Sequence, residues 1–179
     1  MSTLNVTNIK AADGTSALTI ANSSGIVTQA VPSTITTPII FQGHNQSTTY
    51  AAGTSGVWVA STEVIDTANA YNNSTGVFTA PRAGYYHCSW HALFRAGGSS
   101  SSLRVNFRKN GTNYGTSGTP GQSSLLYVDA EPGDEENVSM SAIIECAASD
   151  TIDVHQVVSV GNIYGSTNSH NGLSIFFIG

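Results

Sequence analysis

The chain has 179 residues, of which only 9% are charged, and its formal net charge of −5 comes from six basic and eleven acidic side chains. This length predicts one domain with a hydrophobic core and a short appendage, and it argues against two full domains. The few Lys and Arg residues form no basic patch, which argues against nucleic-acid binding because contact with a phosphate backbone requires clustered cations.

Residues 1–34 come first in chain order and differ from the rest. Short apolar patches at residues 4–6, 18–20 and 26–27 are separated by polar turns. These patches carry too few apolar side chains to close a core, so we expect the segment to become ordered only against partners. The following "PSTITTP" predicts a stiff linker into the main domain, residues 35–179.

The main domain shows no helical periodicity, and Gly, Pro or paired Ser/Thr interrupt it about every ten residues, which is typical of an all-β sandwich or barrel. The predicted strands cover residues 38–43, 56–61, 63–66, 76–80, 84–94, 102–110, 123–130, 137–147, 151–160 and 172–179. The Asn110–Gly111 pair at the end of one strand predicts a tight primed turn, at which the chain reverses.

The predicted strand 84–94, "GYYHCSWHALF", carries large side chains on both faces. Alternation assigns one set of residues to the core: Tyr86, Cys88, Trp90, Ala92 and Phe94. It assigns the other set to the opposite face: Tyr85, His87, Ser89, His91 and Leu93. A solvent-facing strand in a chain this rich in Ser and Thr would carry small polar residues. One interpretation is therefore that the second face meets another subunit.

The stretch "YNNSTGVFTAPRAGYYHCSWHALF" resembles the C1q and tumour-necrosis-factor (TNF) head-domain superfamily. The matching residues are Tyr71, Thr75, Gly76, Phe78, Thr79, Pro81, Gly84 and Tyr86. Further matches follow in order at residues 103–111, 146–154 and 170–179, so the resemblance covers about residues 38–179. Three departures suggest a distant member: Cys88 replaces an aromatic residue, while Ser149 and Ile175 stand where the family often has Gly.

The resemblance implies a ten-stranded jelly-roll sandwich that assembles as a homotrimer. In this family the central strand lies on the inner sheet and faces the three-fold axis. The implied trimer-interface residues are Tyr85, His87, Ser89, His91 and Phe177. This arrangement would explain the large side chains on both faces of strand 84–94. The fold class predicted is thus all-β, with an extended β-rich arm at residues 1–34.

The N-terminal "MSTLNVTNIKAADGTSALTI" resembles the start of many tailed-phage fibre and appendage proteins, in which x-L-x-V-x-N-I precedes an Asp-Gly-Thr turn. This resemblance implies that residues 1–34 attach to other virion proteins through Leu4, Val6 and Ile9. The leading hypothesis is a trimeric phage fibre, appendage or decoration protein whose head binds a host glycan or protein. The segment lacks the features of a secretory signal, so we expect synthesis in the host cytoplasm and residence in the virion.

The sequence fits two other function classes less well. A cellular or secreted C1q-like module that recognises carbohydrate or protein is the alternative, and the missing leader and collagen-like stalk count against it. An enzyme such as a capsule depolymerase is disfavoured, because the sequence has no nucleophile elbow, P-loop, zinc-protease motif or paired carboxylates. The sequence also contains no apolar run of transmembrane length, so no membrane insertion is expected.

Candidate cofactor sites are few, and no cofactor is predicted. Copies of His87 or His91 around a three-fold axis could bind zinc, although hydrogen bonding across an interface is the favoured interpretation. The acidic stretch Asp129–Asn137 is interpreted as a solvated turn, with calcium binding as the alternative.

The two cysteines and three of the aromatic residues each have both a structural and a functional interpretation. Cys88 and Cys146 are expected in the same core as reduced thiols rather than as a disulfide. Trp58, Tyr114 and Tyr127 are candidates for stacking on sugars, with a core position favoured for each.

Overall fold

The computed structural model describes residues 8–10, 16–20 and 27–29 by their backbone, and residues 38–46, 55–97, 101–115, 125–158, 161–164 and 170–179 with their side chains. The chain divides into two compact units, Met1–Thr37 and Pro38–Gly179. All the elements in the described residues are β-strands.

The N-terminal unit contains one small antiparallel sheet. Its strands are β1 (Asn8–Lys10), β2 (Ser16–Ile20) and β3 (Val27–Gln29), in the order β1-β2-β3. Of the predicted attachment residues, Leu4 and Val6 lie outside the described residues, and Ile9 lies in β1, where only the backbone is described. That residues 1–34 become ordered only against partners stays a prediction.

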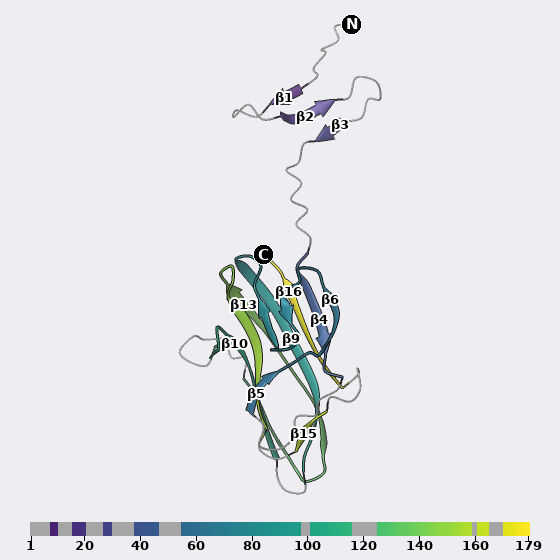
Figure 1. The fold of residues 1–179 in the computed structure, drawn as a ribbon, viewed down its shortest axis with the longest axis vertical. Coiled ribbons are helices and arrows are strands. Elements are labelled where there is room, and N and C mark those ends of the chain that lie inside the picture. The colour runs from purple at the N-terminus through teal and green to yellow at the C-terminus, as the bar shows by residue number, and fades with distance from the viewer. Residues whose placement is uncertain are drawn as a thin grey trace. The chain divides into compact units, whose positions relative to one another are not determined.

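The C-terminal unit is built from two sheets. The first sheet has the strand order β13-β9-β16-β4-β6, with β15 paired to β9. Its strands are β4 (Ile40–His44), β6 (Thr62–Asp66), β9 (Gly84–Arg95), β13 (Glu135–Cys146), β15 (Asn162–Ile163) and β16 (Asn171–Phe177). Figure 1 shows β9, β16 and β4 side by side in one layer, with the end of β16 beside the start of β4.

The second sheet has the order β11-β10-β14-β8-β7, with β12 paired to β10 and β5 to β14. Its strands are β5 (Ser55–Trp58), β7 (Tyr71–Asn72), β8 (Val77–Thr79), β10 (Ser101–Lys109), β11 (Thr112–Asn113), β12 (Leu125–Ala130) and β14 (Thr151–Val158). From β8 onward the chain repeatedly crosses from one sheet to the other, as it must in a sandwich whose sheets share one core. The predicted all-β sandwich is confirmed.

The core lies between the two sheets and contains the predicted side of strand β9. Tyr86, Cys88, Trp90, Ala92 and Phe94 are all buried, as alternation along the strand predicted. Trp90 meets Trp58 of the second sheet edge to face, with ring centroids 6.2 Å apart. These rings join the sheets, since each comes from a different layer.

Local backbone geometry explains two features of the sequence. Asn110 and Gly111 both have positive φ, 52° and 73°, as a type I′ turn requires, and they join β10 to β11. The predicted reversal at this pair is confirmed. Ser149, which stands where the resembled family has Gly, also has a positive φ of 73°. Ser149 therefore adopts the left-handed conformation, which Gly adopts most easily, in the turn of that hairpin.

Candidate functional site

The open face of the first sheet, on the side away from the core, carries most of the exposed apolar groups in the described residues. The large hydrophobic side chains exposed there are Val64, Ile65, Tyr85, Ile143, Phe176 and Ile178. Tyr85 is 49% exposed and Ile143 is 53% exposed, although both lie on long strands in regular pairing. A clustered exposed apolar surface of this kind makes this face a candidate interaction site.

The strand register brings these groups into one surface. His87 of β9 pairs with Ile143 of β13 on one side and with Phe176 of β16 on the other. Phe176 in turn pairs with Ile40 of β4. Side chains directly opposite one another on the same face are in contact range, so four strands contribute to one continuous row of three apolar side chains and His87, here called the apolar row.

Four of the predicted interface residues lie on this open face. Tyr85 and His91 are exposed, and His87 and Ser89 are half-buried in the isolated chain. Phe177, the fifth predicted residue, lies instead on the core side, where it pairs with Tyr86 and its ring centroid lies 5.2 Å from that of Tyr86.

Phe176, the preceding residue, lies on the open face and is 37% exposed. Sequence reasoning also missed Val64, Ile65 and Ile143. Alternation along strand 137–147 could have identified Ile143, since it falls out of phase with the buried Ile144.

Histidine side chains lie around a small hollow of about 90 Å³ on the same face, between His44, Val64 and His91. Gly172 makes room for the His91 ring, since a Cβ at position 172 would lie 2.6 Å from His91 Cε1. Partial desolvation lowers the pKa of His91, so its imidazole is uncharged at neutral pH and suited to an apolar contact. Among the residues that the structure describes, no three His, Cys, Asp or Glu side chains gather in a way that could hold a metal ion.

The two cysteines are free thiols buried in the core, as the sequence predicted. Cys88 is fully buried and Cys146 is 3% exposed. Burial raises the pKa of the Cys88 thiol well above its usual range and that of Cys146 to about 11. Both groups therefore stay protonated at neutral pH and act as small hydrophobes rather than as nucleophiles.

The acidic stretch 129–137 covers the end of β12, the connecting turn at residues 131–134 and the start of β13, and its carboxylates face solvent. Asp129, Glu131 and Asp134 are exposed, and Glu135 lies 3.6 Å from the exposed Arg95. An ion pair this exposed contributes little to stability. The geometry matches a solvated turn.

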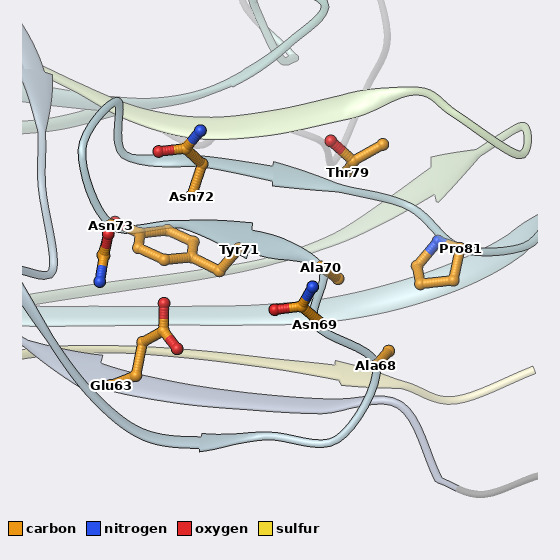
Figure 2. Close-up of a pocket in the computed structure, with 9 residues that line it drawn as sticks. All are labelled: Glu63, Ala68, Asn69, Ala70, Tyr71, Asn72, Asn73, Thr79 and Pro81. Carbon is orange, nitrogen blue, oxygen red and sulfur yellow. The ribbon is translucent and has the colours of Figure 1, made fainter.

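A polar hollow of about 700 Å³ lies beside β7 and is lined by Glu63, Ala68, Asn69, Ala70, Tyr71, Asn72, Asn73, Thr79 and Pro81. Figure 2 shows Glu63 and Asn73 on one side of the hollow and Pro81 at the other. The Asp66 carboxylate accepts hydrogen bonds from the backbone N–H groups of Ala68, Ala70 and Tyr71. Asp66 therefore stabilises the loop that forms this hollow, and the loop's shape needs no ligand.

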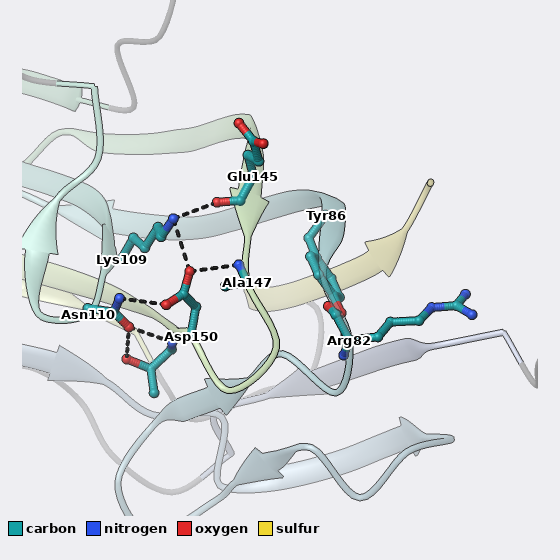
Figure 3. Close-up of polar contacts among 8 residues, drawn as sticks. Arg82, Tyr86, Lys109, Asn110, Glu145, Ala147 and Asp150 are labelled. Carbon is teal, nitrogen blue, oxygen red and sulfur yellow. Dashed lines mark hydrogen bonds and ion pairs between the residues drawn. The ribbon is translucent and has the colours of Figure 1, made fainter.

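Asp150 organises the hairpin that precedes β14. It accepts hydrogen bonds from the Asn110 amide and the Ala147 backbone N–H, each at 2.8 Å, and pairs with Lys109 at 3.0 Å (Figure 3). These donors stabilise the charged carboxylate and lower its pKa to about 2. Lys109 also donates to the Glu145 carbonyl oxygen, which links the hairpin to β13.

Asp150→Asn should lower stability at neutral pH and weaken the dependence of stability on acid. The folded-state pKa of Asp150 lies below the unfolded value of about 4, so its contribution is present above pH 4 and is lost as the pH falls toward 2. Urea unfolding at pH 7 and at pH 3 measures this, with Asp129→Asn as an exposed control. Equal acid sensitivity of Asp150→Asn and the unmutated protein would contradict the assignment.

Comparison with solved structures identifies the fold. The globular domain of zebrafish complement 1qA protein is 16% identical, with a TM-score of 0.53 over 79% of this chain and 98% of that chain. The Eiger TNF from S. frugiperda is 10% identical, with a TM-score of 0.53 over 79% of this chain and 93% of that chain. No family model and no curated protein matches the sequence. The C-terminal unit, Pro38–Gly179, thus has a C1q/TNF-like jelly-roll fold.

Two further observations concern the function classes. Neither structural neighbour is named as an enzyme. No helix in the described residues is long and apolar enough to cross a membrane.

The three aromatic residues that are candidates for stacking on sugars have different environments. Trp58 is in the core, Tyr114 packs against the core, and Tyr127 is 48% exposed on the second sheet.

Proposed function

We propose that residues 38–179 form the head of a homotrimeric binding protein that assembles through the open face of the first sheet. The observation that carries this proposal is the apolar row on that face, in which His87 lies between Ile143 and Phe176. Removing such groups from water contributes about 25 cal/mol per Å² of apolar area, whereas an exposed ion pair such as that of Arg95 with Glu135 contributes little. The trimer expected from the family resemblance would cover this face.

Native mass spectrometry tests the assembly directly. We expect a species of three times the 18.6 kDa chain mass, because the three-fold arrangement buries the open face of each copy. Analytical ultracentrifugation over a dilution series gives the same answer in solution. A folded monomer at every concentration, with Tyr85 accessible to solvent, would contradict the proposal.

The finer proposal is that this assembly is part of a phage virion, as a fibre, appendage or decoration protein. Its support is the resemblance of the first twenty residues to phage fibre proteins, together with a separate N-terminal unit ending at Thr37. In this proposal residues 1–34 attach to the particle and the head contacts the host surface. Immunogold labelling of purified particles with antibodies to the head should decorate the tail or capsid.

A cellular or secreted recognition module is the second candidate, and the named structural neighbours, a complement protein and a TNF, favour it. The location of the gene separates the two candidates, since a virion protein is expected to be encoded beside tail and capsid genes.

Neither candidate function requires catalysis. Incubation with host polysaccharide should release no new reducing ends; their appearance would indicate an enzyme.

A further inference from the structure

The open face of the second sheet contains a hollow of about 540 Å³ over strands β12, β10 and β14. Its main lining residues are Arg104, Asn106, Leu125, Tyr127, His155 and Val157. This volume is in the usual range for small-molecule sites. The hollow lies on the opposite layer of the sandwich from the proposed trimer interface, so assembly through the first sheet would leave it accessible.

The strand register places these side chains in two neighbouring rows. Arg104 pairs with Tyr127 on one side and with Val157 on the other. One step along the sheet, Asn106 pairs with Leu125 and His155. Each row therefore combines apolar and polar groups. The apolar members are the large hydrophobic residues exposed on this face: Leu125, Tyr127 and Val157.

Asn106 lines the hollow and carries an unused hydrogen-bond acceptor. Its side chain is on the central strand β10, and the residue is only 7% exposed. Its Oδ1 atom is buried and has no hydrogen-bond partner. A buried amide oxygen without a donor is unfavourable, so the site is suited to a ligand with an O–H or N–H group at this point.

Arg104 supplies a positive charge at the rim. Its guanidinium carbon lies 5.1 Å from the centre of the Tyr127 ring, so the cation and the aromatic ring present one surface. Among the described residues, the ion pairs of basic groups involve Arg95, Arg108 and Lys109, and Arg104 is in none of them. Arg104 is therefore available to a ligand carboxylate.

The other charged groups of this face leave the Arg104 charge unpaired. Asp129, which lies two residues from Tyr127 on the same face of β12, is exposed and is in no ion pair among the described residues. Arg108 and Asp153 neutralise each other through a contact of 2.7 Å beside the hollow. Burial, and then the nearby Arg108, lower the pKa of His155, so its imidazole is neutral at pH 7 and can both donate and accept a hydrogen bond.

We propose that this hollow binds an acidic saccharide. The ligand carboxylate pairs with Arg104, a ring hydroxyl donates to Asn106 Oδ1, and the C–H groups of the sugar pack on Tyr127, Leu125 and Val157. The inference rests on the proposed function as a binding head, because it names the ligand class that such a head recognises. An extended peptide fits less well, since peptides add to sheet edges through backbone hydrogen bonds, whereas this hollow lies on the face of three paired strands.

Ligand-observed and protein-observed NMR titrations test the proposal with methyl glucuronide and N-acetylneuraminic acid as probes and methyl glucoside as the neutral control. At least one acidic sugar should bind with a Kd of about 1 mM or tighter, and the neutral sugar at least about tenfold more weakly. Equal binding of the neutral sugar, no binding of either acidic sugar, or tighter binding of an acidic tetrapeptide would overturn the proposal.

Variants locate the site. Arg104→Gln and Tyr127→Ala should each weaken acidic-sugar binding at least about tenfold, because each removes one exposed contact. Arg95→Gln is the matched control, since it removes the same charge from the first sheet and should leave sugar binding unchanged. Circular dichroism checks that every variant is folded. Unchanged binding in Arg104→Gln would overturn the site assignment.

The two proposals fail in different ways. If the protein is a trimer but binds no acidic sugar, only the proposal of the saccharide site is contradicted. If the chain is a monomer but binds the sugar through Arg104 and Tyr127, only the proposal of the trimer is contradicted. Both readouts are available from one protein preparation, by native mass and by NMR titration.

Discussion

His87→Asp is expected to convert the proposed trimer into folded monomers. In the isolated chain His87 is half-buried between Ile143 and Phe176, and assembly would enclose it further. A carboxylate there would have to lose its hydration without a cationic partner, and the three-fold axis would bring three such charges together. A buried unpaired charge destabilises by about 3 kcal/mol or more, which corresponds to at least about a hundredfold weaker assembly.

The matched control for this variant is His155→Asp. His155 is also a half-buried histidine on a sheet face, but it lies on β14 in the second sheet. The same substitution there should leave the trimer intact in sedimentation and native mass measurements. If His87→Asp stays trimeric while it remains folded, the open face of the first sheet is not the interface.

The sequence predicted the faces of β9 correctly because one strand contains its own alternation. Cys88 and Trp90 fall in phase with each other and out of phase with His87, whatever strands lie beside them. The turn at Asn110–Gly111 could be predicted for a similar reason, since its positive φ values depend on the two residues themselves. Local signals of this kind were sufficient for the all-β class, whereas the C1q/TNF-like jelly roll was predicted from the family resemblance.

The residues that form the candidate surfaces could not be predicted from alternation within a single strand. Phe176 and Phe177 are neighbours in sequence, and only the pairing of β16 with β9 shows which of them faces away from the core. In β6 a shift of register opposite Gln42 and Gly43 accompanies exposure of both Val64 and Ile65, which strict alternation would not predict.

The hollow on the second sheet depends even more on long-range pairing. Tyr127, Arg104 and Val157 come from three strands that are distant in the sequence, and they become neighbours only through the register of β10 with β12 and β14. Asn106 gives no signal in the sequence, because its significance depends on burial without a donor for Oδ1. Sequence reasoning reached only Tyr127, as one of several aromatic candidates.

Trp90→Ala should produce the largest loss of stability in the fold itself. Trp90 is fully buried, faces Trp58 across the sandwich at an interplanar angle of 83°, and has no hydrogen-bond partner for its indole N–H. It therefore stabilises the sandwich by packing, and removing the ring leaves a cavity between the two sheets. Such truncations cost about 3–5 kcal/mol, a large part of the 5–15 kcal/mol that is typical of a whole domain.

Thermal unfolding of the monomer measures this loss, since assembly adds its own stabilisation. In the His87→Asp background, Trp90→Ala should lower the Tm by about 6–20 °C. Trp90→Phe should cost less, because it keeps most of the packing and removes an unpaired N–H. His91→Ala, one residue away on the open face, should change the Tm of the monomer little. A similar loss in His91→Ala and Trp90→Ala would mean that the two faces of β9 are not separated into core and open surface.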